Sequence, residues 1–143
     1  MAKILIVEDD EKLRNELNIF LNSNGYESCY LKSFENPIED ILRESADLIL
    51  LDINLPNLDG EYICKEIRKM SNVPIIMVTS RDNEIDELIS LNNGADQYIT
   101  KPYNIRILLA KVSGLLKRAQ HTEASQNKIN YNGLTLDISK SII

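Results

Sequence analysis

The sequence has no long apolar run, and its first residues lack the pattern of a secretory leader; each feature argues against a class of protein. No run approaches the ~18 apolar residues that a helix needs to cross a bilayer. The first residues, MAKILIVEDD, carry one lysine followed by carboxylates and so do not resemble a secretory signal peptide. We therefore expect a soluble, cytoplasmic protein that has no membrane partner.

Cysteines and basic clusters are also scarce. Cys29 and Cys64 lie far apart without metal-ligand spacing, so small buried or half-buried positions explain them better than redox chemistry does. The chain carries 16 Lys and Arg against 22 Asp and Glu, a net charge of -6. Because affinity for nucleic-acid phosphates comes mainly from clustered basic side chains, this chain alone is not expected to bind DNA.

Apolar runs that alternate with amphipathic segments dominate the 143 residues. Strands are predicted over 4–7, 27–31, 48–51, 75–78 and 97–100, and each is followed by a predicted helix, the fourth over 83–92. Such alternation predicts an α/β domain with a parallel sheet, and the weakly apolar second strand suits an edge. Two strand orders are plausible, and we adopt 2-1-3-4-5 on the strength of a resemblance described below.

Polar residues suited to phosphate chemistry follow four of the predicted strands. In open α/β sheets, ligands bind beyond the carboxyl ends of the strands, where the strand order reverses. Glu8 and Asp9 follow the first strand and Asp52 follows the third. Thr79 and Lys101 follow the fourth and the fifth. In the adopted order the three carboxylates converge.

Three converging carboxylates repel one another unless a cation compensates them, and Mg²⁺ is a hard cation that prefers oxygen ligands. The backbone carbonyl of Asn54 is a further candidate ligand. Asp52 would then be the nucleophile that forms an aspartyl phosphate, while Lys101 and Thr79 bond phosphoryl oxygens. Each residue taken singly is explained equally well as a cap, turn or loop residue, but their joint placement favours one phosphoryl-transfer site.

The motifs ILIVEDD, LILLDINLPNLDG, PIIMVTSR and GADQYITKPY closely resemble the receiver domains of two-component response regulators over residues 3–119. The resemblance implies a flavodoxin-like α/β fold, with a five-stranded parallel sheet in the order 2-1-3-4-5 and five helices. It also implies that Glu8, Asp9, Asp52 and the Asn54 carbonyl hold Mg²⁺, and that a partner histidine kinase phosphorylates Asp52.

By the same resemblance, Thr79 and Tyr98 form a switch pair, in which the threonine moves toward the phosphoryl group and the ring turns inward. The Lys101–Pro102 bond is commonly cis in this family. We therefore expect a switch that assists its own phosphorylation and dephosphorylation, and not an enzyme. The alternative is a degenerate receiver that acts as a protein-interaction scaffold without phosphorylation.

The last residues indicate a second domain. Residues 1–119 are predicted to form the receiver, and the polar stretch 120–128 is predicted to be a linker. Residues 129–137 alternate around Asn132-Gly133, a hairpin signal. The tail 129–143 is similar to the start of the winged-helix effector domain of the OmpR/PhoB subfamily. Two short strands do not stand alone in water, so we expect a truncated effector domain, with DNA bound only through its missing part.

Activated receivers of that subfamily usually dimerise through the fourth helix, fifth strand and fifth helix, using three charged pairs. The corresponding positions in this chain are Glu87 with Ile107, Gln97 with Lys111, and Asp96 with Arg118. Only the third pair keeps opposite charges, but exposed pairs contribute only ~0.2–1 kcal/mol each. We therefore expect a homodimer face that is more apolar than usual and centred on Ile107, with burial of Ile107 in the core as the alternative.

Two other functions fit the pattern less well. A haloacid-dehalogenase-type phosphatase also uses an aspartate nucleophile at a strand end, but it wants an acid two residues later, where this chain has Asn54. A flavin-binding domain shares the fold but needs a phosphate-binding loop after the first strand. The carboxylates at positions 8–10 would repel that phosphate.

Overall fold

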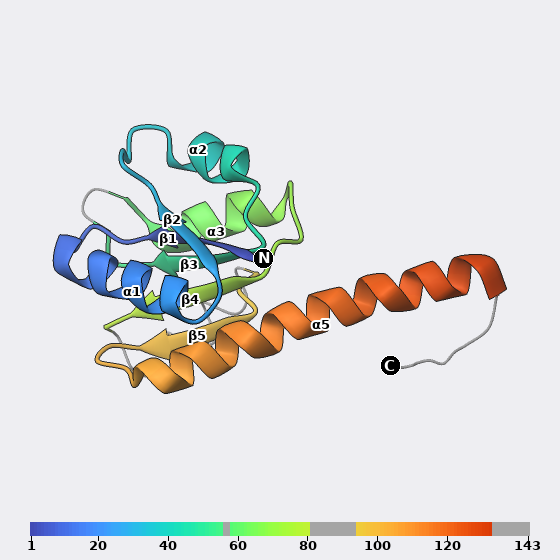
Figure 1. Cartoon of the computed structure of the whole chain (residues 1–143). Helices are drawn as coiled ribbons and strands as arrows, with labels where there is room; N and C mark the ends of the chain where they lie inside the picture. The colour runs from blue at the N-terminus through green and yellow to red at the C-terminus, as the bar shows by residue number, and fades with distance from the viewer. Residues whose placement is uncertain (56–57, 81–93, 133–143) are drawn as a thin grey trace.

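The computed structural model describes residues 1–55, 58–80 and 94–132 (Figure 1). Its strands are β1 (Lys3–Val7), β2 (Glu27–Tyr30), β3 (Leu48–Asp52), β4 (Ile75–Thr79) and β5 (Gln97–Thr100). All neighbouring strands pair in parallel, and the order is β2-β1-β3-β4-β5. The predicted fold class and strand order are therefore confirmed, with the least apolar strand, β2, at one edge.

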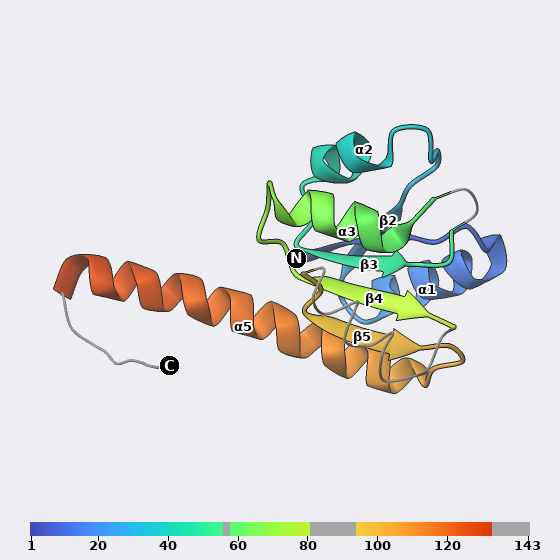
Figure 2. The ribbon, with the colours of Figure 1, turned by 180° about the vertical axis from the view of Figure 1, so that it is seen from behind.

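Helices cover both faces of the sheet. The described helices are α1 (Glu11–Ser23), α2 (Pro37–Glu44), α3 (Gly60–Arg68) and α5 (Ile105–Asn132). Helices α1 and α5 lie on one face, whereas α2 and α3 lie on the other, which faces the viewer in Figure 2. The helix predicted over 83–92 lies outside the described residues. Within the described part of the chain, none of these helices is long and apolar enough to cross a membrane.

Alternate side chains of the central strands enter two separate cores. Leu51 and Met77 pack toward α2 and α3, whereas Leu50 and Val78 pack toward α1 and α5. Every residue of β3 and β4 is buried, because helices cover both faces of a parallel sheet. This two-sided burial explains why these strands appear in the sequence as continuous apolar runs.

The strand register brings the polar residues to one edge of the sheet. Val7 pairs with Leu51, so the residues after β1 and the last residue of β3 end at the same level. Thr79 pairs with Thr100 at the ends of β4 and β5. The carboxyl ends of these four strands therefore form one rim.

Side-chain caps fix the starts of two helices at this rim. Asp10 precedes α1, and its carboxylate accepts a hydrogen bond from the Leu13 backbone N–H at 3.2 Å. Asp59 precedes α3 and accepts from the Glu61 N–H at 2.9 Å. Gly60, which follows this capping residue, is the first residue of α3.

Helix α5 extends further than predicted. It runs for 28 residues to Asn132, through the segment 120–128 that we predicted to be a linker (Figure 1). Residues 129–132, predicted to begin a hairpin strand, are helical, so this strand prediction was wrong; the rest of the hairpin, 133–143, lies outside the described residues. A helix anchored by its packed first half can propagate through a segment that contains no glycine or proline, whether or not the segment forms an apolar stripe.

Candidate functional site

Three carboxylates meet where β1 and β3 end. Glu8 and Asp9 follow β1, Asp52 is the last residue of β3, and carboxylate oxygens of the three lie within 4.8 Å of one another. Glu8 is 4% exposed and Asp52 is 3% exposed, whereas Asp9 is exposed to solvent. The structure therefore brings together the three acids that the sequence singled out.

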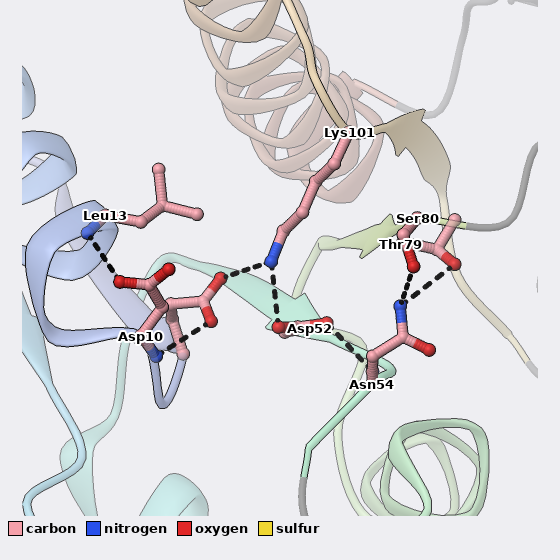
Figure 3. A network of polar contacts seen from close by, with 8 residues as sticks. Asp10, Leu13, Asp52, Asn54, Thr79, Ser80 and Lys101 are labelled. Atoms are coloured by element: carbon pink, nitrogen blue, oxygen red, sulfur yellow. Dashed lines mark hydrogen bonds and ion pairs between the residues drawn. The ribbon is translucent and has the colours of Figure 1, made fainter.

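Lys101 joins two of these carboxylates. Its Nζ donates hydrogen bonds to Glu8 Oε1 at 2.9 Å and to Asp52 Oδ2 at 3.1 Å (Figure 3). The other oxygen of each acid accepts from the backbone: the Asp10 N–H lies 3.1 Å from Glu8 Oε2, and the Asn54 N–H lies 2.8 Å from Asp52 Oδ1. Both buried acids are thus held at both oxygens.

The charges in this cluster are strongly coupled. Burial and the neighbouring Asp52 carboxyl raise the pKa of Glu8 to about 7, although Lys101 and the Asp10 N–H act in the opposite direction. Burial lowers the pKa of Lys101, but its bonds to Glu8 and Asp52 outweigh that effect and leave the pKa raised. Among the described residues, Lys101 pairs with two of the three acids, so negative charge remains to be compensated.

The donor set fits a hard divalent cation. Carboxylate oxygens from Glu8, Asp9 and Asp52 are close enough to share one ion, and the exposed Asp9 leaves a side open to water. Mg²⁺ combines one or a few carboxylates with several retained water molecules. An incoming cation would also favour the ionised form of Glu8, whose pKa is raised by burial and by the neighbouring Asp52 carboxyl.

The residues after β4 contact the loop after β3. The Asn54 amide nitrogen lies 3.0 Å from Ser80 Oγ and 3.5 Å from Thr79 Oγ1, and the Thr79 side chain is fully buried (Figure 3). On β5, the Thr100 hydroxyl donates to the Tyr98 hydroxyl oxygen at 3.2 Å. The Lys101–Pro102 peptide bond is cis, as the resemblance implied.

Several residues of the predicted dimer face have partners within their own chain. Lys111 Nζ lies 3.2 Å from Gln97 Oε1. Asp96 Oδ2 accepts from Arg68 at 3.0 Å and from the Ile75 N–H at 2.9 Å. These contacts occupy groups that we had assigned to pairs between two chains.

Ile107 is 53% exposed on α5, so the alternative that it belongs to the core is wrong. Arg118 is also exposed on this helix. Glu87 lies outside the described residues.

Sequence reasoning missed two residues close to this site. Ser80 was quoted only within a motif, yet its hydroxyl contacts the Asn54 amide. Gly60 was quoted only as the last residue of another motif, but it packs directly on the backbone of Asp52 and Ile53. A glycine immediately after a helix-capping aspartate was the only available signal, and it does not reveal a contact made through space.

The comparisons with known proteins agree with this geometry. Residues 4–113 match the family model of the response regulator receiver domain. The chain is 37% identical over 145 residues to the sensory transduction protein RegX3 of Mycobacterium tuberculosis, covering 100% of this chain and 64% of that protein. It is 38% identical over 143 residues to the transcriptional regulatory protein YxdJ of Bacillus subtilis, covering 98% of this chain and 62% of that protein.

A solved structure shares the fold. The crystal structure of a two-component response regulator from Clostridium difficile matches with a TM-score of 0.78 and 36% identity, covering 83% of this chain and 98% of that chain. The chain spans 64% and 62% of the lengths of the two curated relatives, so it corresponds to a part of each. With the family model matching most of the chain, and the acids and lysine gathered at one rim, the chain belongs to the receiver domain family of two-component response regulators.

Proposed function

We propose that this domain accepts a phosphoryl group on Asp52 from a histidine kinase, with Mg²⁺ held by Glu8, Asp9, Asp52 and the backbone carbonyl of Asn54. The observation that carries the proposal is the placement of Lys101 Nζ 3.1 Å from Asp52 Oδ2. A cation that already touches the nucleophilic carboxylate lies within reach of oxygens on a phosphoryl group attached there. The nearby acids supply the ligands for the metal.

In the proposed transfer, an Asp52 carboxylate oxygen attacks phosphorus. The new O–P bond forms as the P–N bond of the donor phosphohistidine breaks, and the electron pair returns to the imidazole nitrogen. Bound Mg²⁺ supplies compensation for the charge on the phosphoryl oxygens. Lys101 then exchanges its contact with Asp52 for one with a phosphoryl oxygen.

Phosphorylation would change the conformation of residues at the carboxyl ends of the strands. The added negative charge calls for partners, and the buried Thr79, the last residue of β4, carries a hydroxyl group that can donate a hydrogen bond. Movement of this hydroxyl toward the phosphoryl group would alter its 3.5 Å contact with the Asn54 amide. Together with inward rotation of Tyr98, this change biases a two-state equilibrium.

The first test is phosphorylation by a small donor. Incubation with acetyl phosphate and Mg²⁺ is expected to add the mass of one phosphoryl group to the intact protein. The addition should be absent without Mg²⁺ and in Asp52→Asn, because the nucleophile or the compensating cation is then missing. Asp40→Asn, which removes a carboxylate on α2 remote from the rim, should leave the modification unchanged.

Beryllofluoride binding provides the second readout. If the unmodified domain gains no mass from acetyl phosphate and binds no beryllofluoride, the phosphoacceptor proposal is wrong and the scaffold alternative is favoured.

In the whole protein, we infer that residues 1–119 form the receiver and that a DNA-binding effector domain begins near residue 129. The match to a protein named as a transcriptional regulatory protein supports this division. The segment 120–128 would then connect the two domains as a helix. Phosphorylation would control transcription through that effector domain.

We also propose that activation creates a homodimer through α5, β5 and the helix predicted over 83–92. Ile107 would lie near its centre, since it is 53% exposed while two of the expected charged groups are already paired within the chain. Glu87, Asp96, Lys111 and Arg118 would lie around it.

Sedimentation of the beryllofluoride-treated domain tests this face. Ile107→Glu is expected to shift the protein toward monomer, because it places a charge in an apolar contact. Ile19→Glu is the matched control, since Ile19 is 66% exposed on α1 and lies outside the proposed face. Unchanged self-association of Ile107→Glu would contradict the proposal.

A further inference from the structure

Gly60, the first residue of α3, lies against the backbone that carries the proposed phosphoacceptor. A Cβ atom at this position would lie 2.4 Å from the Ile53 Cα and 2.8 Å from the Asp52 carbonyl oxygen. Both distances are far shorter than van der Waals contact. The atoms in the way belong to the backbone, so no side chain can rotate to make room.

Neither side of this contact is free to withdraw. The Ile53 N–H donates to the Val78 carbonyl at 3.0 Å, which ties the peptide after Asp52 to β4. On the other side, the carboxylate of Asp59 caps α3, and the Ile63 and Ile67 side chains of that helix are buried in the core. A methyl group at position 60 must therefore displace either the helix or the Asp52–Ile53 peptide.

The displaced peptide lies between the residues on which the site depends. Asp52 supplies the carboxylate, and the next residue but one, Asn54, donates its N–H to Asp52 Oδ1 at 2.8 Å. A shift of the intervening peptide moves both groups relative to Glu8 and Lys101. In a preorganised site, a misplacement of about 1 Å can cost about a hundredfold in rate.

We propose that Gly60 is a positioning residue, which sets the placement of Asp52 and Asn54 for cation binding and phosphoryl transfer by letting α3 begin directly on their backbone. This inference rests on the proposed function, because cation binding and phosphorylation are its readouts. Gly60 itself touches neither the cation nor the phosphoryl group.

The chain offers a matched control for the test. Gly114 lies in α5, and no atom lies within 4 Å of the Cβ that alanine would add there. Mn²⁺ affinity, measured by isothermal titration calorimetry, is expected to weaken by about tenfold or more in Gly60→Ala. Phosphorylation by acetyl phosphate should slow in the same variant. Gly114→Ala should match the unmodified domain in both measurements.

A third variant separates positioning from simple loss of stability. Ile67→Val removes a buried methylene from α3 without contacting the rim. It is expected to lower the melting temperature while leaving the Mn²⁺ affinity of the folded domain unchanged. If Gly60→Ala behaves in this way, with a lower melting temperature and unchanged Mn²⁺ affinity, the positioning role is wrong.

If circular dichroism shows that Gly60→Ala does not fold, the positioning role is tested in the unmodified domain instead. Titration with Mg²⁺ is expected to shift the amide NMR resonance of Gly60 and not that of Gly114, and an unmoved Gly60 resonance would overturn the inference.

The proposed function and the positioning role of Gly60 are contradicted by different results. An unmodified domain that neither binds Mn²⁺ nor accepts a phosphoryl group contradicts the proposed function, whereas normal behaviour of a folded Gly60→Ala contradicts only the positioning role.

Discussion

Replacement of Lys101 by methionine is expected to slow phosphorylation of Asp52 by acetyl phosphate by about a hundredfold or more, the usual cost of removing one preorganised electrostatic partner. Methionine keeps the unbranched apolar stem and removes the ammonium group. That group lies 3.1 Å from Asp52 Oδ2 and 2.9 Å from Glu8 Oε1. The charge that builds on phosphoryl oxygens in the transfer would then lack the ammonium group beside Asp52.

Time-resolved intact-mass measurements at saturating Mg²⁺ provide the rate. Lys111→Met is the control, because Lys111 lies on α5 and contacts Gln97 instead of the rim. An equal phosphorylation rate in Lys101→Met and the unmodified domain would show that Lys101 only compensates the acids of the unphosphorylated site and does not assist the transfer.

The second large effect is on stability as a function of pH in the absence of divalent cations. The pKa of Glu8 is about 7 in the folded domain, against an ordinary value of 4.5. Because the folded state holds this proton more tightly than the unfolded state does, the resulting stabilisation is fully present below about pH 4.5 and is lost as pH rises through about 7. The shift corresponds to at most about 3 kcal/mol.

Urea unfolding followed by circular dichroism, in EDTA at pH 5 and pH 8, measures this loss. In Glu8→Gln the decline in unfolding free energy between the two pH values is expected to be much smaller than in the unmodified domain, because the neutral amide does not titrate. Glu35→Gln, in the exposed segment before α2, should retain the full decline. A decline in Glu8→Gln as large as that of the unmodified domain would rule out Glu8 as its source.

Mg²⁺ should oppose the loss of unfolding free energy between pH 5 and pH 8. A cation that binds the ionised cluster of the folded state stabilises it by mass action, more strongly at pH 8 than at pH 5, since fewer protons then compete. Repeating the urea titrations with Mg²⁺ at both pH values tests this expectation. Equal stabilisation at the two values would argue against a site that includes Glu8.

The fold and the proposed site were predictable to different extents. Continuous apolar runs such as 48–51 predicted buried parallel strands correctly, because burial on both faces leaves a local pattern in the sequence. Glu8, Asp9, Asp52, Thr79 and Lys101 could then be singled out, since the carboxyl ends of parallel strands share one rim. The strand order relied on the family resemblance, because apolar periodicity does not specify which strands are neighbours.

Some features of the structure were not predicted, because no local pattern in the sequence indicates them. The polar residues 120–128 lack an apolar stripe, yet α5 continues through them because it is already nucleated and packed upstream. The contact of Asp96 with Arg68, 28 positions earlier in the chain, was also not predicted. Spacing alone could not reveal a partner supplied by a different helix.

The class of fold and the residue types at the rim could therefore be predicted from the sequence, because apolar period and strand ends are local properties of the chain. How those residues behave depends on contacts between distant segments. The raised pKa of Glu8 follows from its burial beside Asp52. The need for glycine at position 60 follows from the backbone that it meets. Burial and close approach depend on which distant segments fold against one another, and no local pattern encodes those distances.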